Sequence, residues 1–277
     1  MLYTKIIYKS LIQQADSLKT LAKSIDEVAY DEVLKILLTC KGKVIISGVG
    51  KSGHIGRKIA ATLASTGTSS FFVHSTEALH GDLGMIEKND VVIFISNSGE
   101  TNEVIGVIPS LQKRGNKLLA ITSNAQSTLA NTCEATLLVN YDEESCPNNL
   151  APTTSTTLTL AIGDALAAAL IIAKKFKAPD FAIHHPSGSL GKRLLTKVSD
   201  VMERNNLPIV SESASIKETL LAIAGNKFGM AIIINDNERF VGLATDGDIR
   251  RALLKGDWNV IGSKSVSSIM NITPITI

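Results

Sequence analysis

Short, unbroken apolar runs recur along the first half of the chain and constrain its fold more than any other feature. The runs are Val44–Ile46, Phe71–Val73, Val91–Ile95, Leu118–Ile121 and Ala135–Val139. Helix-like segments separate most of them, which is the alternation typical of parallel strands that helices bury on both faces. The sequence therefore predicts an α/β fold, a three-layer sandwich around a five-stranded parallel sheet.

Composition supports this fold class and argues against several functions. Hydrophobic residues make up 44% of the 277 residues but aromatic residues only 4%, so the core consists mainly of aliphatic side chains. A net charge of +2 without blocks of like charge gives no indication of nucleic-acid or membrane binding. The cysteines Cys40, Cys133 and Cys146 form no CxxC pair, which favours a reducing cytoplasm over a disulfide framework or a zinc site.

Two segments outside the predicted sheet read as helices. Residues 5–39 have helical spacing of apolar positions without Gly or Pro, so they form one long or two shorter amphipathic helices. The N-terminal segment is too polar for a secretory signal. Leu158–Ala173 is the most apolar stretch, but Asp164 interrupts it, and it is shorter than the ~20 residues that span a bilayer. We expect a buried or interface helix there.

A smaller unit follows the sheet domain. Composition changes after Pro186, where residues 187–191 read as a Gly-rich loop. Beyond it we expect a helix near Ile216–Ala224, strands at Met230–Ile234 and Phe240–Ala244, and a helix from about Asp248. The predicted domains are a sheet domain at 1–193, a linker at 194–204 and a small α+β unit at 205–265.

The small unit begins to repeat itself near the end of the sequence. Val198–Met202 is echoed by Val266–Met270, which indicates a tandem repeat. The second copy, 266–277, is barely begun where the sequence ends.

The turn Gly48–Gly53 follows one strand and precedes a helix. It matches G-x-G-x-x-G, but a dinucleotide site also wants an acidic residue after the second strand, where His74 stands. A P-loop would need Gly in place of Ile45. A turn required only for packing stays open, although packing does not explain the cation Lys51 at a helix N-terminus.

The segment Ser96–Thr101 is a more specific motif. Gly99 permits a tight turn, and a helix of roughly Asn102–Lys113 follows. Free N–H groups and the helix dipole favour an anion at such a helix start, and three hydroxyls exceed what a helix cap needs. Open α/β sheets bind ligands at the carboxyl ends of their strands, so we predict a phosphate site there.

Other polar residues allow two interpretations each. The cluster Thr153–Thr157 opens the long apolar helix and is either a cap or a ligand contact. His74, His80 and Asp82 form either a metal site or a place where His80 faces a ligand pocket. The pair His184–His185 precedes the Gly-rich loop, and the alternative to a functional role is an ordinary pair of surface histidines.

Taken together, residues 44–193 look like a sugar isomerase (SIS) domain, and residues 242–251 resemble a CBS motif. In detail the chain resembles the arabinose-5-phosphate isomerase family over nearly its whole length. The matching strings are Gly50–Lys58, His80–Met85, Ser96–Glu100, Cys146–Pro147, Leu150–Thr153, and His185–Pro186 before Leu190–Gly191. The order of SIS domain and then CBS motif is itself typical of that family.

The resemblance implies an enzyme that interconverts D-ribulose 5-phosphate and D-arabinose 5-phosphate for Kdo synthesis. Members of the family work without a cofactor or a required metal and assemble as homotetramers in the cytoplasm. By similarity, the catalytic residues are Lys51, Glu100, Glu144 and His185. The substrate-binding residues are Gly67, Thr68, His74, His80, Ser96, Asn97, Ser98, Gly99, Thr101, Ser155 and Thr156, with His74 also an inhibitory metal position.

The chain departs from the family pattern in two places. Ser187 stands where the family usually has a second Gly after His-Pro, and the second CBS motif is nearly absent. In related CBS modules, residues placed like Thr245 and Asp248 contact the phosphate and ribose of an adenosine ligand. A folded dimerisation module without a ligand is the alternative for this unit.

An aldose–ketose isomerisation needs a base, a proton shuttle between two oxygens and a cation near the developing oxyanion. We expect Glu144 or His185 to remove the carbon-bound proton, Glu100 to relay protons and Lys51 to stabilise the enediolate. His185 is slightly preferred of the two, and the sequence alone does not decide between them. We expect all four groups around one edge of the sheet, with His185 reaching the site of a neighbouring subunit because it follows the last strand.

Other classes of protein fit parts of the sequence. SIS domains also sense sugar phosphates in transcription regulators, but residues 1–42 lack a concentrated basic recognition helix. A dinucleotide-dependent dehydrogenase would bind nicotinamide, and another sugar-phosphate isomerase would share most of the site. The sequence does not distinguish lipopolysaccharide, capsule and sugar-alcohol pathways.

Overall fold

The predicted apolar runs form a parallel five-stranded sheet in the order β2-β1-β3-β4-β5. The strands are β1 Val44–Gly48, β2 Ser70–His74, β3 Val91–Ile95, β4 Lys117–Thr122 and β5 Ala135–Leu138. β1 and β3 are buried at every position, because helices cover both faces of the sheet. The predicted fold class is therefore confirmed for the larger part of the chain.

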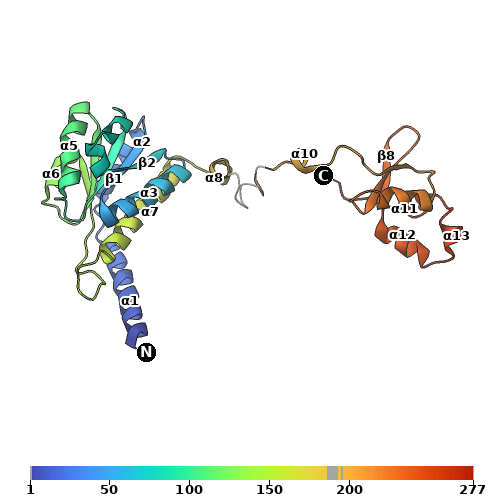
Figure 1. The fold of residues 1–277 in the computed structure, drawn as a ribbon, viewed down its shortest axis with the longest axis horizontal. Coiled ribbons are helices and arrows are strands. Elements are labelled where there is room, and N and C mark those ends of the chain that lie inside the picture. The colour runs from blue at the N-terminus through green and yellow to red at the C-terminus, as the bar shows by residue number, and fades with distance from the viewer. Residues whose placement is uncertain (1, 186–192, 195, 277) are drawn as a thin grey trace. The chain divides into compact units, whose positions relative to one another are not determined.

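Two helical layers enclose this sheet (Figure 1). One layer contains α1 Leu2–Lys23, α2 Glu27–Thr39, α3 Gly50–Ser65 and α7 Thr154–Ala173. The other contains α4 Ser75–Leu79, α5 Asn102–Arg114 and α6 Thr128–Thr132, with the short helix η1 Asp82–Met85 after α4. The sequence allowed one long helix or two shorter ones over residues 5–39. The structure has two helices, and the break between them falls at residues 24–26.

The order of the strands creates a switch point between β1 and β3. The helix after β1, α3, packs on one face of the sheet, whereas the helix after β3, α5, packs on the other. The connections therefore diverge at the carboxyl ends of these two strands, and ligands of open α/β sheets bind in that crevice. Both predicted ligand turns, at Lys51 and at Ser96–Thr101, begin there.

The helix α7 is the expected apolar helix and begins earlier than predicted, at Thr154. By length and composition it could cross a membrane, but Leu158, Ile162, Leu166 and Leu170 pack into the core on the sheet. Its outer side, including Ile172, remains exposed in a single chain. A helix that is apolar on all sides is normally covered on all sides, so this face is suited to contact with another protein surface.

The structure, a computed structural model, describes residues 2–185, 193–194 and 196–276, which form two units, 1–196 and 197–277. The division falls within the predicted linker 194–204, and the exact domain limits remain a prediction. The Gly-rich loop expected at 187–191 lies outside the described residues. The helix α8 Ala178–His184 ends the described part of the larger unit before that loop.

The smaller unit has a three-stranded sheet in the order β6-β7-β8, with helices packed on it. Its elements are α10 Val198–Val201, β6 Ile209–Ser211, α11 Ile216–Ala224, β7 Met230–Ile234, β8 Phe240–Thr245, α12 Asp246–Leu253, α13 Trp258–Ile261 and η2 Val266–Ser268. Val266, expected to open a second copy of the repeat, is buried against Ile233 and Ala244 of this sheet. The segment Val266–Ser268 therefore packs within the smaller unit.

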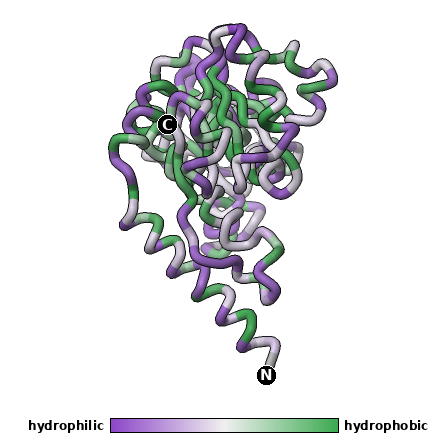
Figure 2. Tube along the Cα trace, turned by 90° about the vertical axis from the view of Figure 1, so that its left-hand side faces the viewer, coloured by the Kyte–Doolittle hydropathy of each residue, from purple (hydrophilic) through white to green (hydrophobic). Residues whose placement is uncertain are grey.

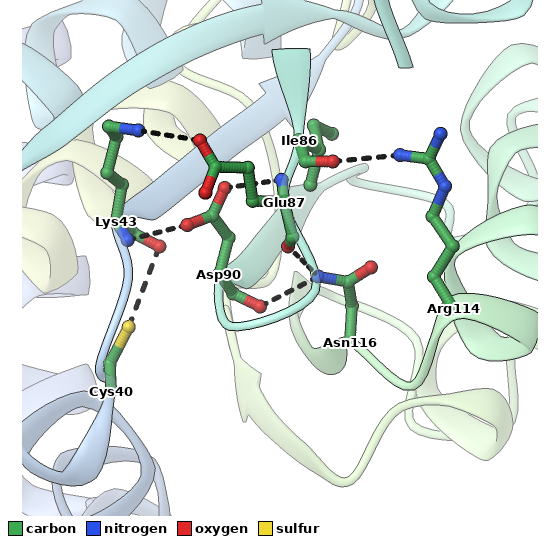
Figure 3. Close-up of polar contacts among 7 residues, drawn as sticks. All are labelled: Cys40, Lys43, Ile86, Glu87, Asp90, Arg114 and Asn116. Carbon is green, nitrogen blue, oxygen red and sulfur yellow. Dashed lines mark hydrogen bonds and ion pairs between the residues drawn. The ribbon is translucent and has the colours of Figure 1, made fainter. Parts of the chain in front are cut away.

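A buried carboxylate, Asp90, ties together the amino edge of the large sheet (Figure 3). Its side chain accepts hydrogen bonds from Lys43 N at 2.7 Å and from Glu87 N at 2.8 Å, and it is 2% exposed. Asn116 Nδ2 donates to the carbonyl oxygens of Glu87 and Asp90, at 2.6 and 3.0 Å. These bonds align the starts of β1, β3 and β4.

Replacing Asp90 with Ala removes the charged acceptor of two backbone N–H groups, those of Lys43 and Glu87. We expect Asp90→Ala to lower the free energy of unfolding by about 3 kcal/mol, because each lost bond involves a charged acceptor. The midpoint of thermal unfolding of the larger unit should fall by roughly 6–12 °C in calorimetry. Asp31→Ala, on the exposed side of α2, is the control. Equal midpoints for the two variants would contradict this role.

Candidate active site

The carboxyl edge of the large sheet gathers most of the predicted site residues. Lys51 lies in the first turn of α3, directly after β1, and its side chain is exposed. His74 ends β2 and pairs in register with Gly48 at the end of β1. The segment Ser96–Thr101 follows β3, between β1 and β4. A cation, an imidazole and the hydroxyl-rich turn therefore lie at the carboxyl ends of three adjacent strands, β1, β2 and β3.

Internal hydrogen bonds shape the hydroxyl-rich turn. Ser96 is buried, and its hydroxyl bonds to that of Thr101 at 2.8 Å and accepts from Gly99 N at 3.1 Å. Ser98 Oγ accepts from Glu100 N at 3.2 Å. The hydroxyls of Ser96 and Thr101 thus hold the turn in place, whereas Asn97 and Ser98 are exposed to the crevice side.

Gly99 is required by both backbone conformation and space. Its φ is +69°, and a Cβ at this position would lie 2.1 Å from Ser127 Oγ. Ser127 caps α6, and Leu129 N donates to Gly99 O at 3.1 Å, so the turn packs directly on the start of that helix. The turn is therefore preformed.

The turn leads straight into α5, whose first N–H groups have no acceptor within the helix. These groups and the positive end of the helix dipole favour a bound anion, and Lys51 adds a cation at the neighbouring strand end. The geometry fits a phosphate group held by backbone N–H groups, a hydroxyl and an ammonium group.

Glu144 is a buried carboxylate held at the start of α7. Its Oε2 accepts from Thr153 N at 2.7 Å, Thr153 Oγ1 at 3.0 Å and Ser155 N at 3.2 Å. Burial raises the pKa of Glu144, but the hydrogen bonds from Ser155 and Thr153 outweigh burial and hold the pKa below its usual range. Glu144 is therefore ionised at neutral pH.

A cavity of about 550 Å³ is lined by Glu144 and by one residue of the hydroxyl-rich turn, Asn97. Its lining residues are Asn97, Ser123, Val139, Asn140, Tyr141, Asp142, Glu144, Asn149, Leu150 and Pro152. Asn97 Nδ2 donates to Tyr141 Oη at 2.9 Å across one side of it. The sequence analysis missed Tyr141 and Asn149, because neither stands in a recognisable motif.

The two predicted hydroxyl residues of α7 have local roles. Ser155 is 2% exposed, and its backbone N–H holds Glu144. Thr156 Oγ1 donates to the carbonyl oxygens of Pro152 and Thr153, at 3.2 and 3.0 Å. Both residues thus shape the helix start beside the cavity, and direct contact with a substrate remains a prediction.

Glu100 has a structural partner that the sequence did not indicate. Its Oε1 accepts from Thr128 N at 2.7 Å, at the first residue of α6. Glu103, in the first turn of α5, is exposed and accepts no hydrogen bond from the described part of the chain. It lies one turn before Gly106, which packs against Leu79 just ahead of His80. The sequence analysis missed this second carboxylate, because it stands just outside the motif that drew attention to Glu100.

The histidines at this edge do not form a metal site with acidic residues. His80 is exposed just after α4, and His74 Nδ1 is buried without a hydrogen-bond partner among the described residues. No three His, Cys, Asp or Glu side chains in the described ranges lie close enough to hold a metal ion. The inhibitory metal position at His74 remains a prediction.

Gly67 and Thr68 lie at the opposite, amino edge of the sheet, which corrects the expectation of a single cluster. They follow α3 and precede β2, so the chain has already crossed the sheet. Lys174, just after α7, donates to Thr68 Oγ1 at 2.8 Å, and Phe176 packs over Gly67. Desolvation lowers the pKa of Lys174.

Within one chain His185 lies beside this second cluster, away from the carboxyl edge that holds Lys51, and the prediction that it reaches the site of a neighbouring subunit stays a prediction. It follows the last residue of α8, its ring stacks on that of Phe181 at 4.0 Å between centroids, and its Nδ1 lies 3.1 Å from Phe181 O. The adjacent His184 stacks on Phe176, which connects α8 to Gly67.

The two clusters are separated by the length of α7. Its first turn holds Glu144, and the residue after its last turn holds Thr68. Its 20 residues extend for roughly 30 Å at a rise of about 1.5 Å per residue. One chain therefore carries two distant parts of the predicted site.

In the smaller unit, Thr245 and Asp248 form a capping box at the start of α12. Thr245 Oγ1 donates to Asp248 Oδ2 at 2.6 Å, and Arg251 pairs with the same carboxylate. Burial raises the pKa of Asp248, but bonds from Thr245 and Arg251 hold it below its usual range. The adjoining cavity of about 550 Å³ is also lined by Lys255 and Lys264.

Comparison with known proteins agrees with this architecture. Residues 37–169 match the SIS domain family, and residues 198–255 match the CBS domain family. Both predicted domain types are thereby confirmed, in the predicted order.

The chain is 49% identical over 271 residues to arabinose 5-phosphate isomerase KpsF of Escherichia coli, covering 98% of this chain and 82% of that protein. It is 49% identical over 228 residues to arabinose 5-phosphate isomerase KdsD of Pseudomonas aeruginosa, covering 82% and 70%. A structure of an E. coli CFT073 protein in complex with arabinose 5-phosphate superposes with a TM-score of 0.64 at 45% identity, covering 66% of this chain and 97% of that one. The chain belongs to the arabinose 5-phosphate isomerase family.

Proposed function

We propose that this protein is an enzyme that interconverts D-ribulose 5-phosphate and D-arabinose 5-phosphate through an enediol. The observation that carries the proposal is the cavity lined by both Glu144 and Asn97, the latter a residue of the preformed turn after β3. A phosphate bound at the turn leaves the sugar carbons directed into a polar cavity. The names of the relatives at 49% identity support the same reaction.

The reaction requires removal of a proton from the carbon next to a carbonyl and its return to the neighbouring carbon. Glu144 is ionised, and its hydrogen bonds engage Oε2. We propose that the other oxygen, Oε1, removes the carbon-bound proton. Lys51, exposed at the start of α3, stabilises the negative charge of the enediolate.

Two carboxylates compete for the proton relay between the two sugar oxygens. Glu100 is the residue that the sequence indicates, but Thr128 N engages its carboxylate at the start of α6. Glu103 accepts no hydrogen bond among the described residues, and it lies one turn before Gly106, which packs against Leu79 of α4. The geometry therefore favours Glu103 as the relay and Glu100 as a support of the turn.

We further propose that a complete site forms between subunits. His185, Gly67 and Thr68 lie roughly 30 Å from Glu144 along α7, so they serve the site of a neighbouring copy. Exposed apolar side chains on α1, such as Tyr3 at 78% and Leu11 at 62%, and Ile172 on α7 supply surface for assembly. Figure 2 shows hydrophobic and hydrophilic residues alternating along the N-terminal helix α1. A homotetramer provides such contacts.

A regulatory role of the smaller unit, through a bound nucleotide, remains a proposal. Three cations, Arg251, Lys255 and Lys264, line its cavity together with the carboxylates of Asp248 and Asp257, and the cations could meet the phosphates of a nucleotide. Because Thr245 and Asp248 already bond to each other, a nucleotide would meet a prearranged capping box. A role in Kdo synthesis and a cytoplasmic location follow from the proposed substrate and are part of the same proposal.

The activity and the base can be tested together. Purified full-length protein should convert ribulose 5-phosphate to arabinose 5-phosphate, identified by NMR of the product. Glu144→Gln should lower kcat by about 10²–10⁴-fold, the usual range for loss of a general base. The neighbouring Glu143→Gln should stay near wild type. No conversion by the wild type contradicts the proposed function, and an active Glu144→Gln contradicts the assigned base.

The relay is tested by a pair of matched amide substitutions. Glu103→Gln should lower kcat by about 100-fold or more, because an amide cannot carry the proton. Glu100→Gln keeps an oxygen that can accept from Thr128 N, so its kcat should fall much less. Steady-state kinetics with ribulose 5-phosphate measure both. A larger loss in Glu100→Gln would return the relay to Glu100.

Sharing of the site between subunits predicts complementation. Lys51→Met and His185→Ala homomers should each be nearly inactive, because each lacks one part of every site. Mixed oligomers, formed by co-expression, should regain part of the activity through sites that combine the intact part of each chain. Activity no higher than the sum of the two homomers would show that the site is not shared in this way.

A further inference from the structure

The helix α1 contacts the segment that carries Glu144 through one glutamine. Gln14 Oε1 accepts from Thr157 Oγ1 at 2.6 Å, in the first turn of α7. Gln14 Nε2 donates to Ser145 Oγ at 3.1 Å, on the residue next to Glu144. Ser10, one turn earlier on α1, donates to the same Ser145 Oγ at 2.9 Å. Gln14 thus joins the loop before α7 to α7 itself.

The same two segments provide the setting of the Glu144 carboxylate. The loop supplies its backbone, and Glu144 N donates to Asn149 Oδ1 at 2.7 Å. The first turn of α7 supplies the N–H groups of Thr153 and Ser155 that hold Oε2. A shift of the loop relative to α7 would lengthen these bonds. The amide of Gln14 spans the two segments and opposes such a shift.

Docking of α1 does not depend on Gln14. Leu21 is buried in the core beneath α7, and Leu18 packs against that core. Gln14 is only partly buried, so its removal leaves no large cavity. Its hydrogen bonds therefore orient the loop before α7, whereas apolar packing holds α1 in place.

We propose that Gln14 is a positioning residue for Glu144, acting from α1 across the loop and the start of α7. This inference rests on the proposed isomerase function for its catalytic meaning. The structural part, that Gln14 restrains the loop 142–149 against α7, stands on the hydrogen bonds alone. Gln13 adds to the restraint by donating to Glu143 Oε1 at 3.1 Å.

The test compares Gln14→Met with Gln112→Met in the full-length protein. Both substitutions place a side chain of similar size on a helix, and Gln112 is exposed on α5 without a side-chain hydrogen bond among the described residues. Gln14→Met should lower kcat by about 10–100-fold with a small change in KM, because a misplaced general base slows the chemical step. Gln112→Met should match wild type.

The pH profile separates positioning from a merely structural role. The bonds from α7 hold the pKa of Glu144 down, so loosening them raises that pKa. The acidic limb of kcat, where Glu144 becomes protonated, should move to higher pH in Gln14→Met and stay in place in Gln112→Met. Ser145→Ala should shift the limb in the same direction, and the double variant should lose less than the two single losses combined.

A second measurement does not depend on turnover. Hydrogen exchange of the peptide covering 142–157 should be faster in Gln14→Met than in Gln112→Met, with thermal midpoints of the two variants close to each other. Unchanged exchange, or an unchanged kcat and acidic limb in an active protein, overturns the proposal for Gln14. A wild type without isomerase activity overturns the proposed function instead, and the exchange experiment still decides whether Gln14 restrains the loop.

Discussion

The length of α7 determines how this chain can build a site. The helix is anchored on the sheet along one face, so its two ends are fixed at opposite edges. One end holds the carboxylate of Glu144, and the other lies beside Thr68 and the helix that ends in His185. Side-chain rotation cannot bridge roughly 30 Å, so in the proposed site the residues at the far end serve another copy. Under this proposal, assembly is part of the chemistry.

Glu144 illustrates how the fold keeps a charge inside. Burial alone would favour the neutral acid, but the first N–H groups of α7 have no acceptor within the helix and lie beside the carboxylate. These N–H groups donate to the carboxylate, so both are hydrogen-bonded, and Gln14 of α1 bonds to the same helix start. A carboxylate held in this way is ionised without a bound substrate, as the proposed base must be.

Much of the fold was readable from the sequence, because parallel strands buried on both faces leave unbroken apolar runs. Lys51 and Ser96–Thr101 were also placed correctly, since each directly follows a strand. Gly67 follows a helix that has returned to the amino edge, and counting this crossing would have placed it correctly. The partner of Glu100 is 28 residues away, on α6, and no local pattern announces it. The bonds of Gln14 to Ser145 and Thr157 depend on tertiary packing in the same way.

The packing of Gly99 on Ser127 has a consequence for selectivity among sugars. Because the turn is already packed on the start of α6, it does not change its shape around a ligand. We therefore expect it to hold the phosphate of a pentose and that of a hexose equally well. Discrimination by chain length and by the configuration of each hydroxyl must then arise at the far end of the sugar. In the proposed shared site, that end meets what the neighbouring copy contributes. The proposal thus assigns recognition of the phosphate and recognition of the rest of the sugar to different polypeptides.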